Sequence, residues 1–574
     1  MALLIVCAYF NIEFMSHKII IYQVFTRLFG NRSLNRKENG TLVENGCGKM
    51  SFFDATVLHR IKKLGVTHIW YTGVIRHASK TDYSEFGIPR QHPAVVKGNA
   101  GSPYAITDYY DVDPDLAENV GDRMGEFEAL LARTHKAGMK VIIDFVPNHV
   151  ARQYKSVAKP VGTKDLGETD DTNMGFSPSN NFYYCVNTPF EPYFDLHSGK
   201  CGPYTEFPAK ATGNDHFDSH PGVNDWYETV KLNYGVDYCD AGGRSYHFSP
   251  VPNTWMKMID ILRFWAGKGV DGFRCDMAEM VPVEFWSWAI SSMKADYPGL
   301  LFIGEVYNPS LYRSFVAAGF DYLYDKVGMY DCLCGVMRGT CPASAITWQW
   351  QAVDDIKEHM LYFLENHDEI RLASDFLAGD ARRGFPALAV SALMYNNPFM
   401  FYAGQEFGER GMDKEGFSGI DGRTTIFDYW TVMSLYNGYV DRRKLSIGEK
   451  MVEQYYSKVL NVATTEKAVS CGLFFDLMYV NNNSVGFNPD RHYAFMRKCD
   501  DEVLLVVANF SGVQADCEIV IPAHAFEFLH LPETTVWAKD LMSDDAPLQM
   551  VLSCGCSVEV KVSAYGCRVY KFIV

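Results

Sequence analysis

Short apolar runs recur along most of the chain, and the segments between them repeat apolar residues with the period of an amphipathic helix. Two of these segments, 125–139 and 253–269, finish at or next to a glycine, which helix C-caps prefer. The alternation predicts an α/β fold, a closed parallel (β/α)8 TIM barrel. The eight strands are expected at 19–25, 66–74, 140–147, 270–276, 300–307, 320–325, 361–368 and 399–406.

Two regions interrupt this alternation. Residues 149–232 are rich in Asn, Gly, Pro and aromatic residues without a clear period, which predicts a loop-rich inserted domain B after the third strand. From about residue 473 the pattern changes to alternating strands and turns, so 473–574 is expected to form a C-terminal antiparallel β-sandwich. The catalytic barrel then comprises 16–148 and 233–472. The terminal domain could pack on its own barrel or on a neighbour's, which leaves the oligomeric state open.

Composition narrows the class of partner. The chain has a formal charge of -16 and no Lys/Arg run, which disfavours nucleic acid and anionic membranes. No apolar stretch approaches the roughly 20 residues that cross a bilayer. Aromatic residues make up 14% of the chain and suit stacking on sugar rings. The 15 cysteines are scattered, which favours reduced thiols, and the Cys332, Cys334 and Cys341 cluster lacks zinc-site spacing.

The N-terminus bears on localisation. An apolar decapeptide opens the chain, with no basic residue before it and no small-residue cleavage motif after it. We therefore expect residues 1–14 to be an upstream extension or a tail before a second possible start at Met15, and the protein to be cytoplasmic. The alternative is a secretory or lipid-anchored leader through Cys7, with a periplasmic or surface location.

Charged and polar residues follow four of the expected strands. Because the carboxyl ends of barrel strands meet at one mouth, these side chains are expected to converge. Several carboxylates at one point, without an obvious metal cage, indicate glycosyl transfer, in which one acid attacks the sugar and another protonates the leaving oxygen. The residues are Asp144, His149, Arg274, Asp276, Glu305, His367 and Asp368.

Arg274 and Asp276 lie two residues apart in a strand and so point to the same side. An adjacent guanidinium is expected to lower the pKa of the Asp276 carboxyl and keep this nucleophile charged. Glu305 lies in the run LFIGEVY, whose apolar residues are expected to favour a protonated acid. A structural ion pair that closes the barrel is the alternative interpretation of Arg274 and Asp276.

Four motifs together resemble the α-amylase family, glycoside hydrolase family 13. They are DFVPNH at 144–149, GFRCD at 272–276, GE at 304–305 and ENHD at 365–368. The resemblance implies retaining hydrolysis of α-1,4-glucosidic bonds in starch-like glucans or maltooligosaccharides through a covalent glucosyl-enzyme. It implies Asp276 as nucleophile, Glu305 as general acid/base and Asp368 as transition-state stabiliser, with no cofactor for the chemistry.

The same resemblance assigns residues that bind the sugar at the cleavage point. His149 and His367 are expected on its hydroxyls, with Arg274 orienting the nucleophile. Tyr104 matches the family's tyrosine that stacks under the ring, and Asp108 matches a nearby structural acid. A core or surface aromatic is the alternative for Tyr104.

The chain departs from the family pattern at two places. Many relatives continue the second motif with Ala-Lys-His, whereas this chain has Ala278, Glu279 and Met280, which puts acceptor-side binding in doubt. Lys231 stands where relatives with calcium carry an aspartate, and an ammonium is a poor neighbour for a divalent cation. Asn148 is left as one candidate ligand for a structural calcium.

Two alternative functions remain. A transglycosylase or sugar isomerase would use the same acids but pass the glucosyl group to another sugar. A non-catalytic carbohydrate-binding or partner subunit would lack one of the acids, and all three are present.

Overall fold

The computed structural model describes residues 18–197, 201–238 and 243–574. The predicted extension at 1–14, with Cys7 and the possible start at Met15, lies outside the described residues. Within the described part, no helix is both long and apolar enough to cross a membrane.

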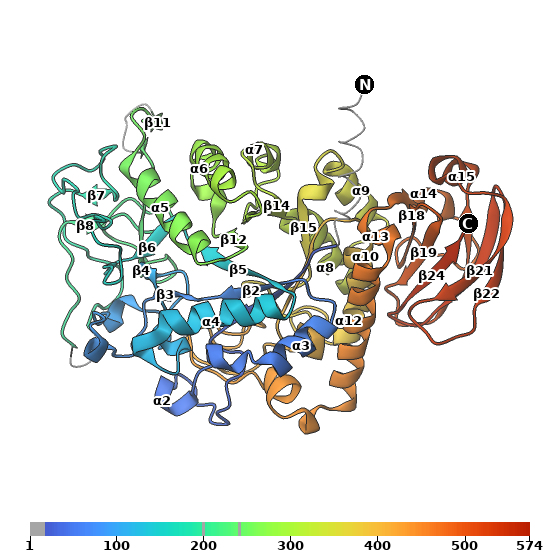
Figure 1. Ribbon diagram of the computed structural model, residues 1–574, viewed down its shortest axis with the longest axis horizontal. Helices are drawn as coiled ribbons and strands as arrows, with labels where there is room; N and C mark the ends of the chain where they lie inside the picture. The colour runs from blue at the N-terminus through green and yellow to red at the C-terminus, as the bar shows by residue number, and fades with distance from the viewer. Residues whose placement is uncertain (1–17, 198–200, 239–242) are drawn as a thin grey trace, which may run out of the picture.

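The centre of the molecule is a closed barrel of eight parallel strands (Figure 1), in the order β1-β16-β15-β14-β13-β12-β5-β2. Each strand falls within one of the eight predicted runs or extends it by one residue, which confirms the TIM barrel. Both faces of such strands are buried, so they appear in sequence as continuous apolar runs. The strands are β1 (Ile20–Phe25), β2 (His68–Thr72), β5 (Lys140–Phe145), β12 (Gly272–Cys275), β13 (Leu301–Gly304), β14 (Tyr322–Tyr324), β15 (Met360–Phe363) and β16 (Phe399–Tyr402).

Helices surround the barrel, and two of them, α3 and α12, begin at side-chain caps. Asp54 caps α3 by accepting the backbone N–H groups of Thr56 and Val57, and Ser446 and Glu449 form a capping box that starts α12. Apolar faces of these helices pack on the strands. The main helices are α3 (Ala55–Lys63), α4 (Arg123–Lys136), α5 (Asn253–Gly267), α6 (Val283–Asp296), α7 (Tyr312–Ala317), α8 (Asp331–Arg338), α9 (Ala345–Ala352), α10 (Phe385–Leu393) and α12 (Ile447–Thr465).

The segment after β5 is an excursion of short paired strands. β6 (His149–Ala151) pairs with β9 (Thr229–Lys231), so that His149 lies opposite Lys231. Two further small sheets join β7 (Tyr184–Cys185) to β8 (Ala209–Lys210) and β10 (Val236–Asp237) to β11 (Ser245–Tyr246). A hairpin of β3 (Ile75–His77) and β4 (Ile106–Val112) follows β2. The domain boundaries at 149, 233 and 473 stay predictions.

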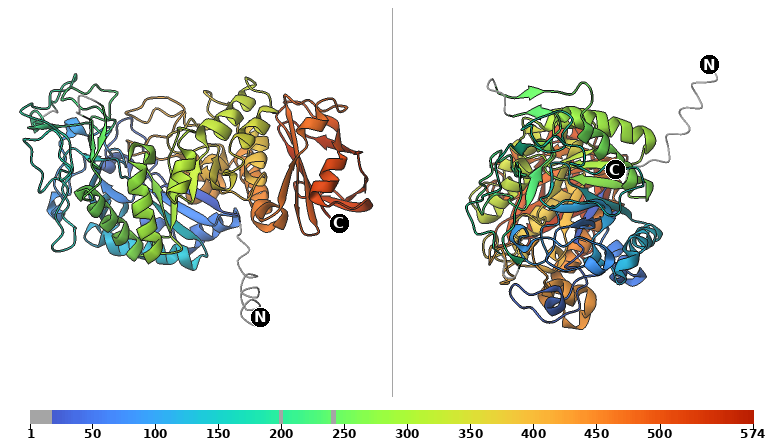
Figure 2. Two further views of the ribbon diagram at one scale, coloured as in Figure 1. Left: turned by 90° about the horizontal axis from the view of Figure 1, so that it is seen from above. Right: turned by 90° about the vertical axis from the view of Figure 1, so that its left-hand side faces the viewer.

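The C-terminal region forms the predicted antiparallel sandwich at the opposite end of the molecule from the inserted segment (Figures 1 and 2). A six-stranded sheet faces the pair β20·β23. The sandwich packs on its own barrel, where the Tyr455 hydroxyl of α12 lies 3.1 Å from the Cys567 sulfur. The strands are β17 (Leu473–Asp476), β18 (His492–Cys499), β19 (Glu502–Asn509), β20 (Ala515–Ile521), β21 (Thr534–Asp540), β22 (Leu548–Leu552), β23 (Cys556–Val562) and β24 (Cys567–Ile573).

Candidate active site

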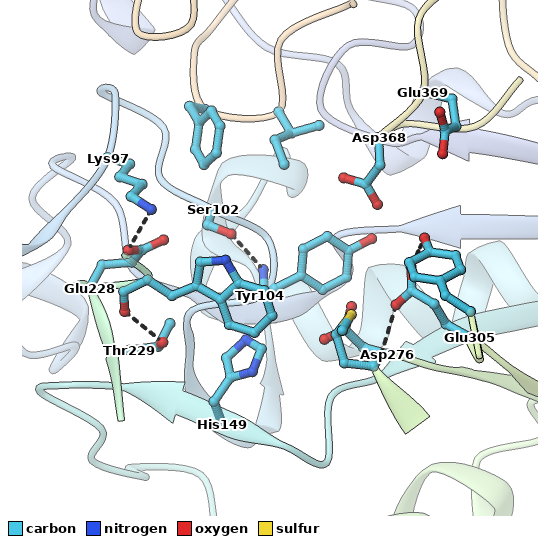
Figure 3. Close-up of a pocket in the computed structure, with 15 residues that line it drawn as sticks. Lys97, Ser102, Tyr104, His149, Glu228, Thr229, Asp276, Glu305, Asp368 and Glu369 are labelled. Atoms are coloured by element: carbon cyan, nitrogen blue, oxygen red, sulfur yellow. Dashed lines mark hydrogen bonds and ion pairs between the residues drawn. The ribbon is translucent and has the colours of Figure 1, made fainter. Parts of the chain in front are cut away.

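A cavity of about 370 Å³ opens at the carboxyl ends of the barrel strands. Figure 3 shows Asp276, Glu305 and Asp368 along one side of it, and Tyr104 and His149 towards the middle. Asp276 follows β12, Glu305 follows β13 and Asp368 follows β15, so three separate strands deliver the three carboxylates. The barrel thus brings together residues that are more than ninety positions apart in sequence.

Arg274 is the electrostatic centre beneath this cavity, with a side chain only 1% exposed. Its Nη1 lies 2.7 Å from Asp276 Oδ1 and 3.6 Å from Asp144 Oδ1, while its Nη2 lies 2.7 Å from Glu305 Oε1. One guanidinium therefore forms ion pairs with three carboxylates. The fork geometry holds Asp276 and Glu305 in fixed relative positions.

The pKa of the Asp276 carboxyl differs from the prediction. Burial raises the pKa of its carboxyl well above the ordinary value, Arg274 opposes this increase, and the negative charges of Glu305 and Asp144 add to it. Arg274 acts to lower the pKa of Asp276, as predicted, but the net shift is upward, so the expectation of a low pKa for this carboxyl is wrong. Burial is the largest cause, and Arg274, which also contacts Glu305, does not offset it.

Glu305 is buried but is surrounded by hydrogen-bond donors. Besides Arg274, the Tyr307 hydroxyl donates to Oε1 at 2.6 Å and the Met277 backbone N–H donates to Oε2 at 2.8 Å. The apolar surroundings predicted from its neighbours in sequence are wrong, because Phe302 and Val306 occupy the opposite face of the strand period.

Asp368 is the most open of the three acids, with 41% of its side chain exposed, and His367 Nε2 lies 2.9 Å from its Oδ2. Burial acts to raise the pKa of Asp368, but the charges of His367, Arg274 and Arg423 outweigh it and lower that pKa below the ordinary value. This carboxylate is thereby kept ionised where it borders the cavity.

Tyr104 and His149 line the cavity, and His367 lies behind them in contact with Tyr104. The Tyr104 hydroxyl lies 2.5 Å from His367 Nε2, and Arg274 lies 5.4 Å from the centre of the Tyr104 ring. The His149 ring packs against Trp226 at 5.2 Å. Burial, reinforced by nearby lysines, lowers the pKa of His149 to about 3, so its imidazole is neutral near pH 7.

Asn148 faces an ammonium group instead of a position that suits a calcium ion. Lys231 Nζ donates to Asn148 Oδ1 and to the Met280 carbonyl at 3.1 Å, and it lies 2.6 Å from Asp215 Oδ1. These three oxygens are of the kind that calcium prefers, but a positive charge already lies among them. The residues present therefore do not fit a calcium ion at Asn148, and calcium binding by this residue stays an untested prediction. Among the described residues, no cluster of three or more His, Cys, Asp or Glu side chains could hold a metal.

Comparison with known proteins identifies the domain. Residues 55–303 match the family model of the alpha amylase catalytic domain. The chain carries an α-amylase family catalytic domain. The match begins at α3 and ends in β13, so it includes Asp276 and stops two residues before Glu305.

Three relatives show how far the sequence similarity extends. Alpha-amylase 3 of Dictyoglomus thermophilum is 22% identical over 86% of this chain and 85% of its own length. Alpha-amylase MalA of Haloarcula japonica is 26% identical, and a cyclomaltodextrin glucanotransferase of Geobacillus stearothermophilus is 21% identical. The matches cover 68% of this chain in both cases, but only 44% and 49% of those two proteins. The α-amylase family domain makes this chain a glycoside hydrolase.

Solved structures agree on the fold. A maltogenic alpha-amylase, AmyB of Thermotoga neapolitana, superposes with a TM-score of 0.60 at 19% identity, covering 98% of this chain and all of that chain. An alpha-amylase of Geobacillus thermoleovorans gives a TM-score of 0.63 at 18% identity, covering 97% and 98%. At these identities the likeness shows a shared α-amylase family fold.

Several residues that line the cavity were not found from the sequence. Tyr307 lies two residues after Glu305, and the strand period was a signal that could have found it. Trp226 and the ion pair between Lys97 Nζ and Glu228 Oε2, at 3.0 Å, also line the cavity. Lys97 and Glu228 come from loops far apart in sequence, and no periodicity connects them.

Proposed function

We propose that the protein hydrolyses α-1,4-glucosidic bonds in starch-like glucans or maltooligosaccharides with retention of configuration. The observation that carries this proposal is the set of three carboxylates lining one cavity, two of them held by the same guanidinium. A pair of acids on one sugar is what glycoside hydrolysis requires.

In the proposed reaction, Asp276 attacks C1 of the sugar while the proton on Glu305 passes to the glycosidic oxygen. The C1–O bond breaks, the shortened glucan leaves with a new hydroxyl, and the sugar stays bonded to Asp276. Water then gives a proton to Glu305, its oxygen bonds to C1, and Asp276 is released. The ionised Asp368 stabilises the positive charge that develops on the ring, and Tyr104 stacks under it.

The roles of the surrounding residues follow from their contacts. Arg274 holds Asp276 and Glu305 in position and balances part of their charge. Neutral His149 is suited to bind a sugar hydroxyl, and His367 bridges Tyr104 and Asp368. No step of this reaction passes through a metal.

Transfer to a second sugar is the other candidate. The relatives include a cyclomaltodextrin glucanotransferase, and the same glucosyl-enzyme reacts with either water or a sugar hydroxyl. The two activities differ in their products, since transfer generates longer or rearranged oligosaccharides.

Chromatography of the products from maltoheptaose and soluble starch tests the proposal. We expect the wild type and the surface control Glu284→Gln to release shorter maltooligosaccharides, and Glu305→Gln to lose at least ~10²-fold in rate. NMR of the first product should show the α-anomer. A β-anomer, or folded wild-type protein that is inactive on both glucans, would overturn the proposal.

A further inference from the structure

Glu279 is the acidic residue at the departure from the family's second motif, and its carboxylate binds backbone. It lies in the 3-10 turn η7 (Ala278–Met280), three residues after Asp276. Its Oε2 accepts the N–H groups of Tyr307 at 3.0 Å and Asn308 at 2.9 Å. Met277 and Tyr307 line the cavity, whereas Glu279 is not among the described residues that line it.

The loop that Glu279 binds carries the proposed acid. Glu305 and Tyr307 occupy the same face of the chain leaving β13, and the Tyr307 hydroxyl donates to Glu305 Oε1 at 2.6 Å. The position of the Tyr307 backbone determines where this hydroxyl can reach. A carboxylate that fixes the backbone N–H of Tyr307 therefore acts on the orientation of Glu305.

A second contact links the same two segments. The backbone N–H of Met277, the residue after Asp276, donates to Glu305 Oε2 at 2.8 Å. Met277 has a left-handed backbone with φ of 41°, a conformation that a non-glycine residue keeps only when its surroundings impose it. The turn after the nucleophile and the loop after the acid are thus joined once by Met277 and once by Glu279.

We propose that Glu279 is a positioning residue that fixes the loop after β13 to the turn after β12 and so aims the Tyr307 hydroxyl at Glu305. This inference rests on the proposed function, because Glu305 matters only as the acid of that reaction. In this proposal Glu279 contacts the loop that carries the general acid and does not bind the acceptor sugar.

The leaving group provides the test. A glucan leaving group needs protonation by the acid, whereas fluoride departs from α-maltosyl fluoride with little assistance. We expect Glu279→Ala to lower kcat/KM, which reports the step in which the leaving group departs, by ~10- to 100-fold on maltoheptaose and by less than ~3-fold on α-maltosyl fluoride. Tyr307→Phe should show the same contrast. Glu279→Gln, which keeps one acceptor oxygen, should lie between Glu279→Ala and the wild type.

The double variant asks whether Glu279 acts through Tyr307. If it does, Glu279→Ala combined with Tyr307→Phe is no slower on maltoheptaose than the slower single variant, because both changes remove one interaction. Glu284→Gln, an exposed carboxylate in the first turn of α6, is the matched control and should change neither rate.

Three results would overturn the proposal. They are equal losses on both substrates, fully additive losses in the double variant, and a raised KM for maltoheptaose with unchanged kcat, which is the signature of an acceptor contact. Thermal unfolding of each variant checks that it is folded. If Glu279→Ala does not fold, the rates of Glu279→Gln on the two substrates test the proposal instead. If the wild type releases fluoride but cleaves no glucan, glucan hydrolysis fails as the function. The contrast between 4-nitrophenyl α-maltoside and the fluoride then decides the role of Glu279.

Discussion

Replacing Lys231 tests whether an ammonium group holds the inserted segment to the barrel. Its Nζ contacts the side chain of fully buried Asn148, the Met280 carbonyl at 3.1 Å and Asp215 at 2.6 Å. Lys231→Met removes the donor from all three of these oxygens while keeping an unbranched apolar side chain of similar length. Lys231→Asp instead supplies another oxygen ligand.

The contacts give the magnitude. Each buried acceptor left without a donor costs about 1–3 kcal/mol. The Asp215 side chain is 32% exposed, so solvent screens its ion pair, which adds about 0–1 kcal/mol. Burial also lowers the pKa of Lys231, which shows that holding the charge there has a cost. We therefore expect Lys231→Met to lose about 2–3 kcal/mol, or about 2 °C in the unfolding midpoint of a chain of 574 residues.

Thermal unfolding in EDTA and in calcium chloride measures these effects. The wild type and the exposed-lysine control Lys155→Met should unfold at the same temperature in both buffers, and Lys231→Met should be lower in both. Lys231→Asp should be lower in EDTA and recover in calcium, by about 2.7 kcal/mol when calcium is at 100 times its Kd. If the wild type loses stability in EDTA, the reasoning is refuted. That result would show that the wild type binds a metal cation, whereas the argument places the Lys231 ammonium where such a cation would lie.

Three further predictions concern charge. Burial raises the pKa of Glu406 from 4.5 to about 7, so the folded protein holds this proton more tightly than the unfolded chain. Stability should then fall by about 3 kcal/mol as pH rises from 4.5 to 7, and urea unfolding of Glu406→Gln should lack this fall; parallel curves would contradict it. Arg274→Lys should lower kcat on maltoheptaose at least ~10²-fold, because an ammonium cannot fork between Asp276 and Glu305, and a near-normal rate would disprove this. Since burial raises the pKa of Asp276, which must be ionised to attack, kcat/KM should decline on acidification at a pH above about 3.9, and a decline only below that value would exclude it as the controlling group.

The barrel was predictable because its strands are buried on both faces. Runs such as 140–147 and 399–406 are short and mostly apolar, and glycines follow the intervening helices. Gly138 and Gly269 have φ values of 74° and 98°, the left-handed conformation that ends a helix and that glycine adopts without strain. Local sequence therefore carried both the strand positions and the helix ends.

The surroundings of the acids were less predictable, because they depend on contacts between strands. Arg274 lies opposite Ile303 in the register of β12 and β13, which brings its guanidinium within reach of Glu305 two residues further along. The alternation along each strand predicts which face a side chain occupies, but it does not predict how neighbouring strands are aligned with each other. The expected pairing of Arg274 with Asp276 alone therefore missed its second partner.

The two departures from the family pattern affect the same turn. Lys231 reaches the Met280 carbonyl from the inserted segment, and Glu279 binds the loop after β13. The turn that follows Asp276 is thus held on one side by a cation from the insertion and on the other by its own carboxylate. The two contacts differ in what they hold, because Glu279 binds the loop of the proposed acid whereas Lys231 binds the Met280 carbonyl and, within the part of the chain that the structure describes, its ammonium forms no hydrogen bond or ion pair with that loop. A loss of Lys231 should therefore appear first in stability, and a loss of Glu279 first in the rate on substrates whose leaving group needs a proton.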